Sequence, residues 1–177
     1  NMVFSNLVME NVPRPIFMTF AQQIASVDTP EGQFEPLKSM HNFSFSNIVV
    51  DNSNLDKNSA FFLTGFPEHQ IEDITIKDVQ FVVSGGGSAA DAQKTNIKEY
   101  TQEVLNGWWP EFSLVGTLPA SGLYARHIDG LVVENFSIKT VNEDKRAPIV
   151  LKNVTNFEVN RVFLNKKIIS KNQILSN

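Results

Sequence analysis

Hydrophobic and polar residues alternate in five short segments of this chain, and all five follow one nine-residue pattern. Apolar side chains occupy the second, fourth, seventh and ninth positions, and Asn, Asp or Arg occupies the sixth. Alternation with a period of two predicts β-strands rather than helices. A pattern that recurs at unequal intervals predicts a solenoid with constant core strands and variable connections. The copies span residues 1–9, 42–50, 73–81, 130–138 and 156–164.

A second short apolar segment follows each of the first four copies. One repeating unit is therefore a strand, a turn, a second strand and a connection of variable length. We expect consecutive units, or rungs, to stack as parallel strands about 4.8 Å apart. The second segments span residues 15–20, 60–64, 123–126 and 147–151.

The polar residue at the sixth position interrupts the alternation in every copy. The fourth and seventh positions are both apolar and both need to face the core, which predicts a bend between them. Asn and Asp tolerate turn conformations and bind nearby backbone groups, so we expect a ladder of them along the coil. Arg161 stands there in the fifth copy, and we expect that rung to be irregular. The ladder residues are Asn6, Asn47, Asp78 and Asn135.

Two insertions and a polar tail complete the predicted organisation. The rungs occupy residues 1–164, with loops inserted at 21–40 and 84–119, and residues 165–177 form a frayed end or a cap. The second loop has a sparse apolar spacing over residues 89–105 that predicts a short helix. Long loops of a solenoid often shape its binding surface.

Composition limits the classes of function that this chain can serve. A net charge of -4 and a pI near 5.4 argue against nucleic-acid binding, because such proteins present a basic face. No apolar run approaches the roughly 18 residues of a membrane span. The absence of cysteine excludes disulfides and thiolate metal sites, and no histidine has a second ligand at metal-like spacing. We therefore expect neither a metal nor a cofactor.

Three stretches of the chain are similar to glycoside hydrolase family 28, the polygalacturonase-like enzymes. They are residues 6–16, 65–76 and 118–131, the last reading Leu-Pro-Ala-Ser-Gly-Leu-Tyr-Ala-Arg-His-Ile-Asp-Gly-Leu. The resemblance covers residues 1–159. It implies an all-β fold, a right-handed parallel β-helix of the pectin-lyase-like kind with about five rungs here. It also implies inverting hydrolysis of galacturonic-acid-containing pectin.

The catalytic motifs of that family are absent from this sequence, which contains no Asn-Thr-Asp, Asp-Asp, Gly-His-Gly or Arg-Ile-Lys. The resemblance therefore implies the C-terminal portion of such an enzyme, with the catalytic carboxylates upstream. Inverting hydrolysis needs two carboxyl groups roughly 6.5–9.5 Å apart, and we find no acidic pair at equivalent positions of the second strands. We predict no catalytic residue here and no activity for the chain alone. The acids considered are Glu68, Glu72, Asp73, Glu111, Asp129 and Glu134.

Five residues are candidates for contact with a sugar. Arg126 and His127 follow a core strand that contains Tyr124, and a guanidinium binds a carboxylate through two parallel hydrogen bonds. Trp108 and Trp109 lie in the second loop, where exposed aromatic rings can stack on sugar faces.

A structural role is the alternative for each of these candidates. Arg126 can pair with an acid of a neighbouring rung, such as Glu68 or Asp129, and His127 can end a strand at the surface. The tryptophans can bury their large apolar area beneath the loop. Arg14, between two prolines, either points into a groove or is solvated.

The sequence supports two hypotheses of function. The first is the C-terminal β-helix part of a pectin-active glycoside hydrolase. The second is a non-catalytic β-helix module, either carbohydrate-binding or an adhesin or fibre segment. We expect a pectin-type polysaccharide or oligosaccharide as partner, no nucleic acid, no membrane, and a secreted or periplasmic location.

The first rung is expected to leave an open sheet edge with exposed apolar residues. Such edges favour association. We therefore expect the chain to pair there with its missing N-terminal half or with a second copy.

Overall fold

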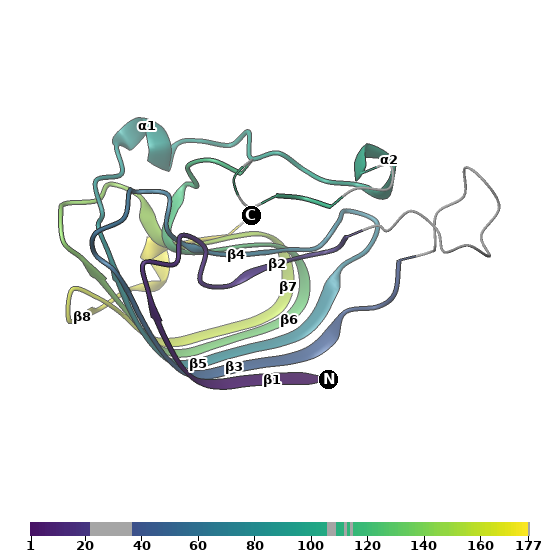
Figure 1. Cartoon of the computed structure of the whole chain (residues 1–177), viewed down its shortest axis with the longest axis horizontal. Coiled ribbons are helices and arrows are strands. Elements are labelled where there is room, and N and C mark those ends of the chain that lie inside the picture. The colour runs from purple at the N-terminus through teal and green to yellow at the C-terminus, as the bar shows by residue number, and fades with distance from the viewer. Residues whose placement is uncertain (22–36, 106–108, 112, 114, 177) are drawn as a thin grey trace.

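The chain folds into a sheet that winds around a common apolar core (Figure 1). The computed structural model describes residues 1–21, 37–105, 109–111, 113 and 115–176. Most of these residues lie in strands, which confirms the all-β prediction. Among the described strands every pairing is parallel except that of β7 with β8. The strands are β1 (Met2–Glu10), β2 (Phe17–Thr19), β3 (His41–Asn52), β4 (Phe61–Thr64), β5 (Ile71–Val83), β6 (Ala120–Thr140), β7 (Ala147–Leu164), β8 (Lys167–Ile168) and β9 (Ile174–Ser176).

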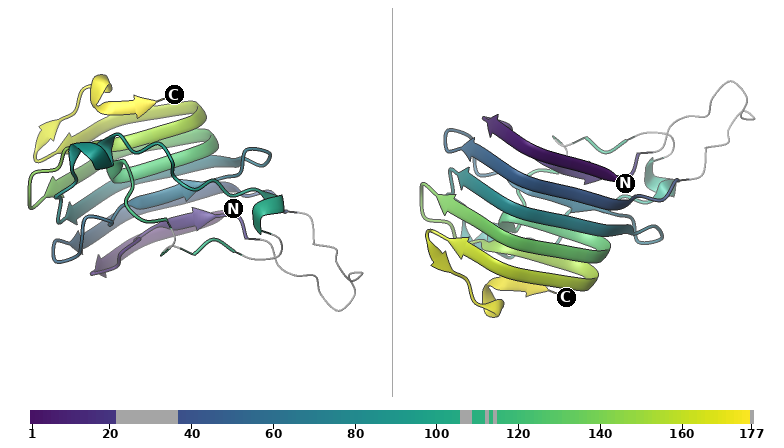
Figure 2. Two further views of the ribbon diagram at one scale, coloured as in Figure 1. Left: turned by 90° about the horizontal axis from the view of Figure 1, so that it is seen from above. Right: turned by 90° about the horizontal axis from the view of Figure 1, so that it is seen from below.

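Each copy of the nine-residue pattern lies in one strand, except that Asn1 precedes β1, and equivalent positions pair between neighbouring strands. Phe4 of β1 pairs with Phe45 of β3, and Phe45 pairs with Ile76 of β5. β6 follows β5, and β7 follows β6. The pairings confirm that the copies are strands and that successive copies are parallel neighbours. Figure 2 shows them side by side, with β1 at one end of the stack and the C-terminal strands at the other.

The second apolar segments form a parallel series of their own. β2 pairs with β4, β4 with the first part of β6, and that part with the first part of β7. β9 then pairs with the first part of β7. The polar tail therefore extends this series, and its residue Ile174 packs against the core.

A left-handed backbone conformation marks the sixth position of every copy. Phe45 and Ile48, before and after the bend at Asn47, are 7% and 0% exposed, so the bend turns both apolar neighbours inward as predicted. Arg161 adopts the same conformation, so the expected irregularity of its backbone is wrong. The φ angles are 58° at Asn6, 52° at Asn47, 53° at Asp78, 54° at Asn135 and 51° at Arg161.

A second bend, which we did not predict from the sequence, lies at the first position of the pattern. Asn, Asp and Gly adopt positive φ more readily than other residues, and the small polar residue at this position is the signal for the bend. The φ angles are 58° at Asn42, 53° at Asp73, 81° at Gly130 and 49° at Asn156.

The described residues of the insert at 84–119 cover the outer face of the second series of strands (Figure 1). Phe62 and Tyr124 point away from the main core and pack with Ile97, Val115 and Leu118 of the insert. The described residues therefore form two apolar clusters, a larger one shared by both series of strands and a smaller one beneath the insert.

The helix expected over residues 89–105 is wrong in extent. The described residues contain only two four-residue helices there, α1 (Ala89–Ala92) and α2 (Gln102–Leu105). A capping box of Ser88 and Asp91 starts α1. Between the helices, the carbonyl groups of Ile97 and Lys98 accept hydrogen bonds from Arg126. These carbonyl groups therefore attach the segment to the sheet and do not take part in helical hydrogen bonds. The first insertion falls mostly on residues 22–36, which lie outside the described part.

The longest described helices are far too short to cross a membrane, and none of them is a candidate span.

Candidate functional site

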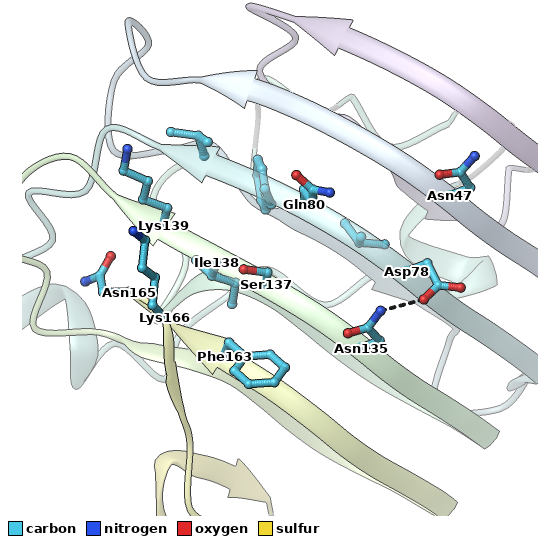
Figure 3. Close-up of a pocket in the computed structure, with 13 residues that line it drawn as sticks. Asn47, Asp78, Gln80, Asn135, Ser137, Ile138, Lys139, Phe163, Asn165 and Lys166 are labelled. Atoms are coloured by element: carbon cyan, nitrogen blue, oxygen red, sulfur yellow. Dashed lines mark hydrogen bonds between the residues drawn. The ribbon is translucent and has the colours of Figure 1, made fainter.

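The outer face of the sheet after the ladder bend carries a groove of about 680 Å³ (Figure 3). We call it the corner groove. Strands alternate the direction of their side chains, so the residues beside the buried Val79 and Phe81 point outward here. The groove is lined by Asn47, Asp78, Val79, Gln80, Phe81, Val82, Asn135, Ser137, Ile138, Lys139, Phe163, Asn165 and Lys166.

Ladder residues form one wall of the corner groove. Asn135 donates its side-chain amide to Asp78 Oδ1 at 2.6 Å, the contact drawn in Figure 3. Asn47 donates in the same way to Asn6 Oδ1 at 2.6 Å. These hydrogen bonds orient the amides along the stack, which confirms the ladder for these two pairs.

The floor of the corner groove is formed by one outward side chain from each of β5, β6 and β7. Gln80 of β5 pairs in register with Ser137 of β6, and Ser137 pairs with Phe163 of β7. Parallel neighbours lie about 4.8 Å apart, so an amide, a hydroxyl and an aromatic ring follow one another at that spacing. A polymer lying across the strands would meet them in turn.

Two lysines stand at the other end of the corner groove, as Figure 3 shows. Lys139 lies in β6, and Lys166 follows Asn165 in a turn with φ of 67°. Asn165 fixes this turn because its Oδ1 accepts from Thr140 N at 3.0 Å and its amide donates to Thr140 Oγ1 at 3.1 Å. Neither ammonium group lies within 4.0 Å of a carboxylate of the described residues.

The chemistry of the corner groove suits a hydroxylated anion. Amides and the hydroxyl group can exchange hydrogen bonds with sugar hydroxyls, the Phe163 ring can pack on an apolar sugar face, and the lysines supply positive charge. Asp78 is the one carboxylate among the described lining residues. Inverting hydrolysis requires a pair of carboxyl groups, and the described lining residues of the corner groove supply one.

Arg126 and Tyr124, predicted to contact substrate, lie beneath the insert. Arg126 is 1% exposed and donates to Ile97 O at 3.1 Å and to Lys98 O at 2.8 Å. Tyr124 is 2% exposed and its ring stacks on Phe62 with centroids 5.8 Å apart. Burial raises the pKa of the Tyr124 hydroxyl. Both side chains hold the insert on the sheet, and neither polar group is presented to solvent.

His127 is buried beside them and is bound through both ring nitrogens. Nε2 lies 2.6 Å from Glu99 Oε1, and Nδ1 lies 2.6 Å from the amide nitrogen of Asn153. The amide nitrogen can only donate, so Nδ1 accepts and Nε2 carries the proton that is donated to Glu99. This hydrogen bond is the main reason why the pKa of Glu99 lies below its ordinary value. The alternative of a surface His127 is therefore wrong.

Glu99 is also the acid beside Arg126, with a nitrogen-to-oxygen distance of 3.7 Å. Tyr124, Arg126 and His127 were predicted to contact a sugar, and they lie together around a segment of the chain itself. Because Glu99 belongs to the insert and not to a neighbouring rung, the rung periodicity could not identify it.

Trp109 is the candidate that lies at the surface. Its side chain is 54% exposed, and Nε1 donates to Glu111 Oε1 at 3.0 Å. Trp108 lies outside the described residues. None of the four described candidates lines the corner groove.

The sequence contains a signal for the corner groove that we did not use. The eighth position of the pattern is Val in the first two copies, then Gln80, Ser137 and Phe163. These are the residues of the floor.

One acidic pair also escaped the sequence analysis. Glu72 of β5 and Asp129 of β6 are register partners. Thr155 and Asn156 each donate to Asp129 Oδ1 at 2.7 Å and hold the pKa of that carboxyl below its ordinary value. Within the part of the chain that the structure describes, no group of three or more potential ligands could hold a metal ion.

Comparison with known proteins gave no match among protein-family models, curated proteins or solved structures.

Proposed function

We propose that this chain is part of a right-handed parallel β-helix that acts on pectin, as in polygalacturonase-like glycoside hydrolases. The parallel, in-register stacking of the five copies and the left-handed residue at each sixth position support this fold. In this proposal, hydrolysis is inverting, and its two catalytic carboxylates come from residues outside this sequence. The partner is a pectin-type polysaccharide or oligosaccharide, and the location is secreted or periplasmic.

The observation that carries the proposal is the position of Lys139 and Lys166 in the corner groove. Neither ammonium group forms an ion pair with a described carboxylate, although the charge of Lys139 acts on Asp51. Both lysines stand beside the amide, hydroxyl and aromatic groups of the floor. Galacturonate units combine hydroxyl groups, an apolar ring face and a carboxylate, so they match all three features.

Titration with an oligogalacturonate, followed by calorimetry at low ionic strength, tests this proposal. We expect the double variant Lys139→Gln, Lys166→Gln to bind about tenfold more weakly, since two partly exposed ion pairs are lost. The double variant Lys38→Gln, Lys171→Gln removes the same charge from exposed sites outside the groove and is the matched control. Equal losses in both double variants would indicate a general charge effect and refute the groove.

Catalysis requires a separate test. We expect no release of reducing sugars from polygalacturonate by this chain alone, because the described groove residues include a single carboxylate. Turnover by the purified chain would contradict that expectation.

The single carboxylate in the groove also favours a second candidate function. A non-catalytic β-helix module, carbohydrate-binding or an adhesin or fibre segment, would bind the polymer in the same groove without any catalytic partner. The gene sequence before residue 1 separates the two. A series of Asn-Thr-Asp, Asp-Asp and Gly-His-Gly there supports the enzyme, and an unrelated domain supports the module.

A further inference from the structure

A second cavity lies where the chain enters β2 and β4. It measures about 350 Å³ and shares no lining residue with the corner groove. Its size is within the range of pockets that hold small molecules. We call it the Arg14 pocket, and it is lined by Pro13, Arg14, Asn54, Leu55, Asp56, Asn58, Ser113 and Gly116.

Arg14 is buried in the wall of this pocket. Arg14 is only 8% exposed, which excludes the solvated side chain that the sequence analysis left as an alternative. Nη2 donates to Gly116 O at 2.5 Å, whereas Nη1 is buried without a hydrogen-bond partner among the described residues. Buried polar groups are nearly always hydrogen-bonded, so an unpaired guanidinium nitrogen calls for an explanation.

The charge of Arg14 is also poorly neutralised. Asp56 is the acid whose negative charge acts on Arg14, but the two side chains form no ion pair within 4.0 Å. The Asp56 oxygens instead accept from Asn58 N at 2.8 Å and from the Asn58 side-chain amide at 2.9 Å. Arg146 adds further positive charge nearby, although it has its own partner in Asp144.

Loss of water around Arg14 lowers its pKa to about 10. The guanidinium therefore remains protonated at neutral pH, and a buried charge without an ion-pair partner is costly. An anion that enters the pocket would offset this cost.

The other lining groups define the rest of the ligand. A guanidinium binds a carboxylate with parallel hydrogen bonds. The Asp56 carboxylate and the side chain of Asn54 provide acceptors, and the amide of Asn54 also provides donors. These groups can hydrogen-bond to sugar hydroxyls. The Asp56 carboxylate would repel a ligand that carries several negative charges. We propose that the Arg14 pocket binds a single uronic acid unit, with its carboxylate on Arg14 and its hydroxyl groups on Asn54 and Asp56.

Binding of D-galacturonate and of D-galactose to the full 177-residue chain tests this proposal, because the two sugars differ only in the carboxylate. We expect galacturonate to bind at least tenfold more tightly, measured by NMR titration. Arg14→Gln and Asn54→Asp should each weaken galacturonate binding about tenfold, the first by removing the charge and the second by repelling the carboxylate. Equal affinity for the two sugars, or no binding of galacturonate, would overturn the proposal.

Asn54→Asp keeps the test valid if Arg14→Gln fails to fold, because Asn54 is exposed. Asn172→Asp makes the same exchange at an exposed position in the tail and is the matched control. Undiminished binding to Asn54→Asp, or equal weakening by Asn172→Asp, would refute the pocket.

Digalacturonate then identifies the source of the ligand. Tighter binding than the monomer assigns the pocket to the end of a polymer, and equal binding assigns it to a free sugar, both in support of the proposal. The test of the Arg14 pocket is separate from the test of the corner groove. If the Arg14 pocket does not bind galacturonate, the Lys139 and Lys166 variants should still weaken oligogalacturonate binding.

Discussion

At the residue scale, a buried ion pair joins three loops at one edge of the sheet. Arg146 Nη2 lies 2.7 Å from Asp144 Oδ2, and the two side chains are 1% and 3% exposed. Arg146 Nη1 donates to Lys57 O at 2.7 Å, and Gly87 N donates to Asp144 Oδ2 at 3.1 Å. The pair therefore fixes the start of the insert against the loops before β4 and β7.

The substitution Asp144→Asn should destabilise the protein by about 3–5 kcal/mol at pH 7, because it leaves Arg146 buried without its counter-ion. Burial raises the pKa of Asp144, but hydrogen bonds and charge from Arg146 outweigh it, so the pKa lies below its ordinary value. A depressed pKa contributes stability above the unfolded-state value, near pH 3.9, and this contribution is lost as the pH falls further. Urea unfolding at pH 7 and at pH 3 should therefore show a smaller difference between variant and wild type at pH 3. A difference that grows on acidification would contradict this.

Gly65 allows a close backbone approach that no other residue could make. A Cβ atom there would lie 2.3 Å from His127 O and 2.9 Å from His69 O. Gly65→Ala should lower the free energy of unfolding by about 3 kcal/mol, since backbone atoms must move. Gly86→Ala is the comparison, because nothing lies within 4 Å of its Cβ and only the φ of 85° is unfavourable. Thermal unfolding should show a clearly smaller loss for Gly86→Ala, and equal losses would refute the clash.

At the scale of the element, the ladder bend combines a strained backbone position with a hydrogen bond. Asn47→Gly removes the bond to Asn6 but tolerates the φ of 52°, and should cost about 1 kcal/mol. Asn47→Ala also loses the tolerance of Asn for the left-handed region, which adds about 1–2 kcal/mol. Urea unfolding of both variants separates the two contributions. If Gly is no better than Ala, the backbone conformation is not the source of the preference for Asn.

The repeated pattern allowed the strands and the ladder bend to be predicted because each copy supplies the same physical signal. Five copies place an Asn, Asp or Arg between two apolar residues that must both be buried, and the positive φ follows from that conflict. The bend at the first position was missed, since Asn42 and Gly130 open the nine-residue pattern, where no alternation is interrupted.

The insert could not be predicted in the same way. The apolar spacing over residues 89–105 allowed a helix, but Arg126, from a strand more than twenty residues away, binds the carbonyl groups of Ile97 and Lys98. Tertiary hydrogen bonds of this kind leave no local signal. The same is true of Arg14, which donates a hydrogen bond to Gly116 O near the far end of the insert.

At the scale of the whole molecule, the two ends of the stack differ. The tail closes one end, where β8 and β9 pair with β7. At the other end, β1 pairs only with β3 among the described strands. Its residues Val3 and Val8 are 73% and 75% exposed, and Phe4 helps to line an apolar hollow of about 260 Å³. Unpaired edges with apolar side chains favour association.

We predict that the chain associates through β1. Light scattering over a concentration series should show an apparent mass that increases with concentration. The double variant Val3→Lys, Val8→Lys should stay closer to the monomer, because charged residues on an edge strand oppose pairing. A wild-type chain that is monomeric at every concentration would rule out the association.

The spacing of strand partners along the chain has a consequence for how the molecule folds. Met2 pairs with Phe43 and Ile74 pairs with Leu131, whereas Leu123 pairs with the nearer Ile149. Closing a longer loop costs more entropy, and sheets built from distant partners form slowly. Among the strands that carry successive copies of the pattern, nucleation is therefore favoured between β6 and β7. A ribosome would release β1, β3 and β5 before β6 and β7, so the pairing with the shortest connection becomes possible last.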